Sequence, residues 1–394
     1  MGIVKPAEIS IVGTGITKFG RFKEKSLKNL GADAISSALT DADLDMADID
    51  MAFVGNAMAA VITGQVSVVG QSIVRAYGFS GIPVFNIDNA CASSSSALNL
   101  AIQAIRAGTA QTVLVLGVEK MITDDRARSY QALNGAADLD ALDLSGIDPT
   151  KESVFVTSIY PKRLAVYQGR YGLSGEVLAQ IAFKNRSHAA RNSNAQFTDP
   201  ISIGDILSAR KIVGPITSLM CSPMSDGAAA LIVTARRNVR PKQRAVGLLA
   251  STVGMGGVIE EIPAIRRIAN LAYQSAGIQP NQIDVAEVHD STAFNELLAY
   301  EELGFCEPGG GARLVAEGAT ALGGKIPVNT SGGLESRGHP VAATGAAQVV
   351  EIVTQLRGEA GERQVPHARI GICENAGGYA RDDTAAIVVT VLAT

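Results

Sequence analysis

Residues 41–55 read DADLDMADIDMAFVG, and residues 275–289 read SAGIQPNQIDVAEVH. Both stretches have the same order of features: the end of a helix, a polar turn, an Ile-Asp pair and a short apolar strand. The pairs Ile49-Asp50 and Ile283-Asp284 lie 234 residues apart. Because self-similarity at a fixed offset indicates an internal repeat, these stretches predict a chain built from two similar halves.

A second pair of similar stretches lies towards the end of each half. Residues 229–234 read AALIVT and residues 385–390 read AAIVVT, which are 156 residues apart. The smaller offset means that the first half carries about 78 more residues between these landmarks. Irregular polar segments place the excess within about 120–215, and insertions of this length are usually functional. We therefore predict halves of 1–240 and 241–394, with a loop domain inserted into the first.

Short apolar runs alternate with stretches of helical spacing along both halves. This alternation, with few hairpin signals, predicts an α/β fold in which helices cover mixed sheets. The expected strands are Ile9–Gly13, Met51–Gly55, Val84–Ile87, Thr112–Gly117, Val246–Ser251, Val285–Val288, Ile370–Cys373 and Ala385–Val391. The expected helices include Ser26–Asp41, Ser93–Arg106 and Ala342–Leu356.

The composition of the 394-residue chain is that of a folded, soluble protein. Hydrophobic residues make up 47% and charged residues 18%, which argues against disorder. The net charge of −4 gives no electrostatic footprint for nucleic acid, and no apolar run reaches the roughly 18 residues of a transmembrane helix. The four cysteines are scattered without a CxxC pair, and no secretory signal is visible. We predict a cytoplasmic protein that binds no metal, nucleic acid or membrane.

The first candidate for chemistry lies in VFNIDNACASSSSALNLAIQAIRAG, residues 84–108. An apolar strand ends at Ile87, and Cys91 follows just before a helix rich in small residues. A cysteine at such a turn lies at the positive end of the helix dipole, which favours the thiolate. The segment alone is equally compatible with an inert buried cysteine.

Three later segments each add a candidate residue. In residues 329–358, His339 stands in Gly-His-Pro, where the proline keeps it extended and able to project into a site. In residues 288–306, His289 ends the duplicated strand, where loops of α/β sheets carry function. In GICENAGGYARDD, residues 371–383, Cys373 ends a strand before a glycine pair. Each residue taken alone also fits a purely structural role.

The four segments in this order resemble the thiolase superfamily, most closely the sterol carrier protein-type thiolases, over nearly the whole chain. The resemblance rests on NACASS, HDxxxxNELL, SGGLxSxGHPxxATG and the terminal glycine pair. It implies the duplicated, five-layered α/β/α/β/α thiolase fold, in which the inserted loop domain covers the substrate. It also implies a homodimer or tetramer that acts on acyl-CoA and CoA.

The resemblance also implies a role for each candidate residue. Cys91 corresponds to the nucleophile that accepts the acyl group, and His339 to the histidine that deprotonates it and faces the thioester oxygen. His289 corresponds to a histidine that stabilises a thioester oxyanion. The remaining oxyanion and substrate-binding groups are the backbone N–H of Cys91 together with Gly377, Gly378, Ser291 and Asn295. Donors fixed at a developing negative charge contribute about 3–4 kcal/mol each.

The chain departs from the family pattern at the acid/base residue. Sterol carrier-type thiolases have a second cysteine where this chain has Ser291, and a serine hydroxyl is too weakly acidic to remove a Cα proton unaided. Other thiolases have that cysteine in a terminal CxG motif, near the place of Cys373. We therefore predict Cys373 as the acid/base, with a structural role as the alternative. If Cys373 lies elsewhere, simple acyl transfer is favoured over Claisen chemistry.

The predicted activity is cleavage of a 3-oxoacyl-CoA with CoA, or the reverse condensation, through an acyl-enzyme on Cys91. Coenzyme A is then a substrate or product, and no tightly bound cofactor is expected. One alternative is a thiolase-like acyltransferase subunit that uses a non-standard acceptor together with a small zinc-ribbon/OB-fold partner. Another is a non-catalytic subunit that binds acyl-CoA or lipid, which the set of Cys91, His289 and His339 argues against.

Overall fold

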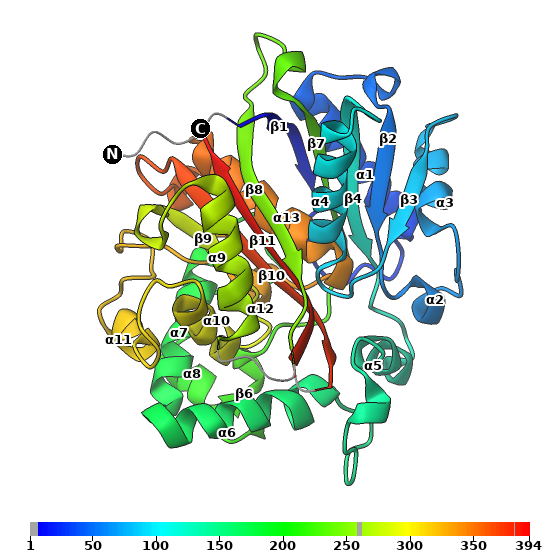
Figure 1. Cartoon of the computed structure of the whole chain (residues 1–394). Helices are drawn as coiled ribbons and strands as arrows, with labels where there is room; N and C mark the ends of the chain where they lie inside the picture. Colours follow the sequence, from blue (N-terminus) through cyan, green and yellow to red (C-terminus); the bar gives the residue numbers. More distant parts are fainter. Residues whose placement is uncertain (1–6, 258–261, 382) are drawn as a thin grey trace.

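The computed structural model describes residues 7–257, 262–381 and 383–394. Its central feature is a continuous sheet in the order β3-β2-β4-β7-β1-β8-β11-β10-β9 (Figure 1). The first half of the chain supplies β1 (Ile9–Ile16), β2 (Met51–Gly55), β3 (Val84–Ile87), β4 (Thr112–Glu119) and β7 (Gly227–Ala235). The second half supplies β8 (Val246–Gly254), β9 (Val285–Glu287), β10 (Ile370–Ala380) and β11 (Asp383–Ala393).

The sheet has the same topology on both sides of the contact between β1 and β8. Going outward from that contact, the first half runs β1, β7, β4, β2 and the second runs β8, β11, β10, β9. In both series the second and third strands pair antiparallel, and the third and fourth pair parallel. The duplicated fold inferred from the repeated stretches is therefore confirmed.

The repeated Ile-Asp pair has a physical reason in each half. The Oδ2 atom of Asp50 accepts hydrogen bonds from the backbone N–H groups of Gln111 and Thr112, at 2.8 and 2.9 Å. Asp284 does the same for Arg369 and Ile370, also at 2.8 and 2.9 Å. Each aspartate thus holds the start of the neighbouring parallel strand in register, β4 in one half and β10 in the other.

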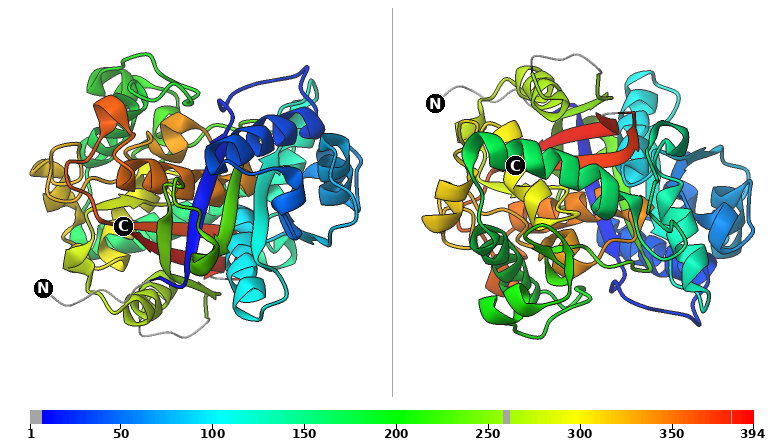
Figure 2. Two further views of the ribbon diagram at one scale, coloured as in Figure 1. Left: turned by 90° about the horizontal axis from the view of Figure 1, so that it is seen from above. Right: turned by 90° about the horizontal axis from the view of Figure 1, so that it is seen from below.

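Three layers of helices and the two halves of the sheet together form five layers, as the fold class predicts (Figures 1 and 2). Helices α4 (Ser93–Arg106) and α13 (Thr344–Leu356) pack against each other in the middle layer and contact strands of both halves. The outer layers are α1 (Leu27–Ala42) and α3 (Val69–Tyr77) on the first half, and α9 (Ala264–Ala276) with α10 (Ala293–Glu302) on the second.

Small residues allow the two middle helices to approach closely. The buried face of α4 consists largely of serine and alanine. A Cβ atom added to Gly345, near the start of α13, would come within 2.8 Å of the backbone nitrogen of Ser95. Small side chains thus allow close packing where the two middle helices meet.

The inserted part of the first half lies between β4 and β7. It contains α5 (Arg126–Asn134), α6 (Tyr160–Tyr171), α7 (Gly175–Ala189), α8 (Ile203–Ser208), β5 (Lys211–Val213) and β6 (Ile216–Thr217). The other short helices are α2 (Ala59–Ile62), α11 (Gly311–Ala316) and α12 (Gly333–Arg337). Among the described residues, no helix combines the length and the hydrophobicity needed to cross a bilayer.

Candidate active site

Cys91 lies in the tight turn that joins β3 to α4. Ala90, just before it, has a φ of 49°, a left-handed conformation that residues with a Cβ atom rarely adopt. The Asn89 carbonyl accepts a hydrogen bond from the Ala92 N–H at 3.0 Å, which closes the turn. Strained backbone of this kind is common at functional sites. The turn holds the Cys91 side chain, which is 8% exposed, at the wall of a cavity.

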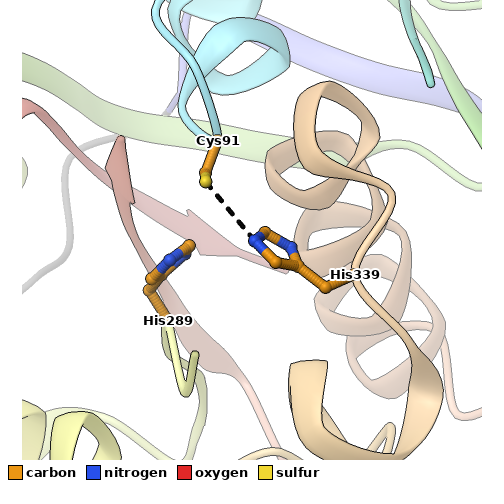
Figure 3. A group of neighbouring side chains, drawn as sticks. All are labelled: Cys91, His289 and His339. Atoms are coloured by element: carbon orange, nitrogen blue, oxygen red, sulfur yellow. Dashed lines mark hydrogen bonds between the residues drawn. The ribbon is translucent and has the colours of Figure 1, made fainter. Parts of the chain in front are cut away.

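His339 is the nearest titratable partner of the thiol. Its Nε2 atom lies 3.3 Å from Cys91 Sγ (Figure 3). On the other side of the ring, Nδ1 lies 2.7 Å from the hydroxyl of Thr344, and that hydroxyl also lies 3.2 Å from the Pro340 carbonyl. A carbonyl can only accept, so the hydroxyl donates to Pro340 and accepts from Nδ1. Neutral His339 therefore presents the lone pair of Nε2 to the thiol.

His289 is the third corner of the same cluster. One ligand atom from each of Cys91, His289 and His339 lies within 4.8 Å of the others, and the two rings meet edge-on with centroids 5.3 Å apart. The amide nitrogen of Asn375 lies 3.1 Å from His289 Nδ1, while the amide oxygen of Asn375 accepts from Ser95 Oγ at 2.7 Å. With this amide placement, neutral His289 carries its proton on Nε2, as an oxyanion donor requires.

Burial dominates the protonation states of the cluster. Desolvation raises the pKa of the Cys91 thiol to about 12, although the backbone N–H groups of Gly378 and Cys91 act in the opposite direction. Desolvation also lowers the pKa of His289 to about 3 and the pKa of His339 well below its usual value. The resting pair is therefore a thiol beside a neutral imidazole, so burial outweighs the helix dipole that the sequence suggested as a thiolate stabiliser.

The glycine pair of β10 lies against the Cys91 turn, with a separate function for each residue. A Cβ atom on Gly377 would lie 2.2 Å from the Asn89 carbonyl oxygen, so only glycine allows this contact. The backbone N–H of Gly378 acts to lower the pKa of the Cys91 thiol, against the larger effect of burial, and Gly378 lines the cavity. The backbone N–H groups of Cys91 and Gly378 thus both favour negative charge at the sulfur, as donors of an oxyanion hole would.

The cavity in front of Cys91 has a volume of about 770 Å³. Its wall combines both halves of the chain with the inserted part, including Met121, Phe155 and Tyr160 from the insertion. Ser291 and Asn295 also line it. The hydroxyl of Ser291 lies 2.9 Å from that of Tyr160, and the amide oxygen of Asn295 accepts from Thr292 at 2.8 Å, at the start of α10.

The structure does not bring Cys373 to this site, so the cavity gives no support to its predicted role as the acid/base. Strand β10 continues through Ala380, paired with β11, instead of ending before a glycine loop. Because side chains of a strand alternate between its faces, Glu374, Ala376 and Gly378 line the cavity while Cys373 does not. The Cys373 side chain is 3% exposed and packs within the hydrophobic core.

Replacing Cys373 with alanine is therefore expected to affect stability and not chemistry. Loss of one buried sulfur atom should lower the free energy of unfolding by about 1–2 kcal/mol. The rate of acyl transfer should stay within about threefold of wild type. Thermal unfolding and a steady-state assay on one preparation check both values, and a variant that is folded but slowed 100-fold would return Cys373 to the mechanism.

Sequence reasoning missed several residues that shape the site. Thr344 and Asn375 set the tautomers of the two histidines, and both stand within segments that had been singled out. The carboxylate of Glu119 accepts from the backbone N–H groups of Ala57 and Ala342, at 3.1 and 3.2 Å, and so ties the loop after β2 to the turn that follows His339. No local sequence pattern predicts these contacts, because each joins distant parts of the chain.

The spacing of Cys91, His289 and His339 is also one that could hold a metal ion. The hydrogen bonds of Thr344 and Asn375 already give each histidine a defined tautomer. In these tautomers the contact between Cys91 and His339 needs no metal ion. The absence of a metal stays a prediction for this site.

Comparison with known proteins places the geometry in context. A model described as "Thiolase, N-terminal domain" matches residues 9–206, and one described as "Thiolase C-terminal domain-like" matches residues 253–390. Human "Sterol carrier protein 2" is 36% identical over 392 residues, covering 94% of this chain and 70% of that protein. "Acetyl-CoA acetyltransferase" of Methanothermobacter thermautotrophicus is 35% identical over 379 residues, covering 94% and 96%.

A solved structure named "Ltp2-ChsH2(DUF35) aldolase" has a similar fold. Its TM-score is 0.78, and the match covers 98% of both chains. The sequence identity is 22%, so this likeness concerns the fold alone.

Proposed function

This chain is an acyltransferase of the thiolase family, and on that premise we propose that it cleaves a 3-oxoacyl-CoA with CoA, or catalyses the reverse condensation. The observation that carries the proposal is the 3.3 Å contact between the Cys91 thiol and the unprotonated Nε2 of His339. A thiol and a base in hydrogen-bond contact are the minimum for covalent acyl transfer.

The proposed first half-reaction uses this pair together with the nearby donors. His339 takes the proton of Cys91 as the sulfur attacks the 3-oxo carbon, and the backbone N–H groups of Cys91 and Gly378 stabilise the oxyanion. The C2–C3 bond then breaks, which leaves an acyl group on Cys91 and a carbanion on the departing thioester. His289 and His339 donate to the thioester oxygen of that carbanion. In the second half-reaction, the thiol of CoA accepts the acyl group.

Coenzyme A is proposed as a substrate and product, not a resident cofactor. The cavity wall includes the exposed basic residues Arg21, Lys23, Arg126 and Lys151, which supports a mouth that accepts phosphates. The four cysteines are all free thiols, which supports a location in the reducing cytoplasm.

An acyl adduct tests the proposal directly. Incubation with acetyl-CoA should add one acetyl group to the intact protein, and peptide mapping should find it on Cys91. Removal of that group by added CoA, with release of acetyl-CoA, should return the original mass. A protein that binds acetyl-CoA without forming an adduct would favour the non-catalytic binding subunit.

The rate of acylation is not expected to rise between about pH 6 and pH 8. Since burial lowers the pKa of His339 well below its usual value, the neutral base is present across this range. Since burial raises the pKa of Cys91 to about 12, bulk titration forms no appreciable thiolate. Rapid-quench acylation measures this, with glutathione as the control thiol, whose reactivity rises with pH. A tenfold rise per pH unit would contradict the neutral pair.

We also propose that the chain forms a homodimer, because strand β3 has an exposed edge. This strand is an outer edge of the sheet, and its Phe85 side chain is 46% exposed. An open edge with an exposed aromatic residue favours pairing with another strand, and a second copy of β3 would supply one. Light scattering on Phe85→Asp should show a lower mass than wild type.

A second candidate function is an acyltransferase subunit that needs a small zinc-ribbon/OB-fold partner. The favouring observation is the likeness in fold to the "Ltp2-ChsH2(DUF35) aldolase", whose name includes a DUF35 component. Purification from the native source under mild conditions would reveal such a subunit, and full activity of the pure chain would argue against it.

A further inference from the structure

We propose that Glu374 is the acid/base group that exchanges the C2 proton of the CoA thioester in the carbon–carbon step. The inference rests on the proposed function, because simple acyl transfer needs no such group. It assigns a catalytic residue at a position that the resemblance to thiolases did not single out.

The carbon–carbon step requires a proton carrier that Cys91 and the two histidines do not supply. Breaking the C2–C3 bond leaves a carbanion at C2, and condensation must create that carbanion by removing a proton. The two positions at which thiolases carry an acid/base cysteine do not supply it here. Ser291 has a hydroxyl that is too weakly acidic, and Cys373 is packed in the core away from the cavity wall.

The geometry of β10 brings Glu374 to the same cavity as Cys91. Glu374, Gly378 and Cys91 all line this cavity, and Glu374 and Gly378 lie on the same face of the strand. One carboxylate oxygen of Glu374 accepts from the backbone N–H of His289 at 2.9 Å. The other, Oε1, is buried and has no hydrogen-bond partner among the described residues. One oxygen therefore fixes the group beside His289, and the other is left for the substrate.

The surroundings of Glu374 match the protonation behaviour that this role needs. Burial raises the pKa of Glu374 to about 7, opposed by the His289 N–H. The charged and titratable groups around it are Glu302 on α10, Arg163 on α6, His289 after β9 and Cys373 on β10, and Arg163 lies 3.6 Å from Glu302. A carboxyl that titrates near neutrality is present in both forms, so it can give and take a proton.

The proton balance closes over one catalytic cycle. Protonated Glu374 transfers its proton to C2 as the C2–C3 electron pair is released, which gives the shortened CoA ester and a carboxylate. The thiol of incoming CoA then gives its proton to this carboxylate and attacks the acyl group on Cys91. Cys91 leaves as a thiolate and regains its proton from His339. Glu374 and Cys91 are thereby returned to their starting forms.

Two other groups of the cavity wall are weaker candidates. Cys221 donates its S–H to the Thr217 carbonyl at 3.5 Å, and burial raises its pKa to about 12. Burial raises the pKa of Glu302 to about 7, opposed by Arg163, and one of its oxygens is also buried without a partner among the described residues, but the other is held in an ion pair with Arg163 at 3.6 Å. Both serve as matched comparisons for Glu374.

The experiment follows exchange of the C2 protons of acetyl-CoA in D2O by mass spectrometry, beside the Cys91 adduct in the same samples. Glu374→Gln keeps an oxygen for the His289 N–H but removes the base. It should lose exchange by at least about 100-fold and still form the adduct, because the departing CoA can leave as a thiolate and take its proton from water. Cys221→Ala and Glu302→Gln should each keep exchange within about fivefold. Wild-type exchange should rise with pH and level off above about pH 7, as Glu374 becomes a carboxylate.

The outcomes separate this inference from the proposed function. Wild-type protein without an adduct would overturn the function itself. Wild-type protein with an adduct but no exchange would overturn only the carbon–carbon step. Exchange that survives in Glu374→Gln, or is lost in Cys221→Ala instead, would remove Glu374 from the role. Loss of both adduct and exchange in Glu374→Gln would assign Glu374 to positioning His289.

Discussion

Replacing Cys91 with alanine should abolish acyl transfer, lowering kcat/KM by at least about 10⁴-fold, which is the range seen when a covalent nucleophile is removed. The methyl group cannot accept an acyl group, and no other cysteine touches His339 in the described residues. A coupled assay for CoA release and intact-mass detection of the adduct should both fall to background. Because Cys91 is buried, at 8% exposed, loss of its sulfur atom should lower the free energy of unfolding by only about 1–2 kcal/mol, as for Cys373, so the variant stays folded.

Cys91→Ser is the matched control for this experiment. It keeps the size of the side chain and the contact with His339 but replaces the thiol with a far weaker acid. Activity should therefore stay near background while binding of acyl-CoA is retained. Turnover by Cys91→Ala above about 1% of wild type would show that the reaction does not pass through this residue.

Replacing Arg337 with methionine should lower the free energy of unfolding by about 3–5 kcal/mol, the usual cost of breaking a buried ion pair from one side. Arg337 is 1% exposed, and its guanidinium lies 3.2 Å from the carboxylate of Glu287, which is fully buried. The same nitrogen donates to Ser331 Oγ at 3.0 Å and to the Ala347 carbonyl at 3.2 Å. Without Arg337, Glu287 would be left charged in the core or would have to bind a proton.

The pH dependence of this loss follows from Glu287. Burial raises its pKa to about 7, and Arg337 opposes that shift. In Arg337→Met the folded-state pKa should rise further, while the unfolded value stays near 4.3. Protonation then favours the folded state of the variant at low pH, so the loss of stability should be smaller at pH 5 than at pH 8. Urea unfolding at both pH values measures it.

The double variant Arg337→Met with Glu287→Leu provides the control. Replacing both charges with apolar groups removes the uncompensated carboxylate, so the double variant should regain part of the lost stability and most of the pH dependence should vanish. If the double variant were as unstable at pH 8 as Arg337→Met alone, packing of the long side chain would explain the loss.

The duplicated fold could be predicted because each repeated feature has a local physical function. Asp50 and Asp284 hold the next strand in register in their own halves, so both stretches keep the same short pattern. The buried strand β7 reads as a continuous apolar run for a similar reason, since both of its faces are covered. Patterns of this kind depend on nearby residues and can be recognised in a single sequence.

The meeting of Cys91, His289 and His339 could also be predicted, from the order of three motifs. The place of Cys373 could not, because it depends on where β10 ends. Gly377 and Gly378 suggest a loop, but pairing with β11 extends the strand past them and decides which side chains face the cavity. Asn375 and Glu374 were missed for the same reason. Their contacts with His289 arise from the pairing of β10 with β9, which no short pattern announces.

Cys91 and His339 are 248 residues apart, on opposite halves of the chain. During synthesis the cysteine leaves the ribosome long before its base exists, so the nascent first half carries an ordinary thiol. Strand β1 likewise pairs with β8, which is synthesised much later. Until β8 is present, the edge of β1 that it will occupy is open to incorrect pairing. Contacts this distant form late and slow folding. The contact between the thiol and the imidazole is therefore a property of the finished protein, formed only when the last helix of the middle layer packs into place.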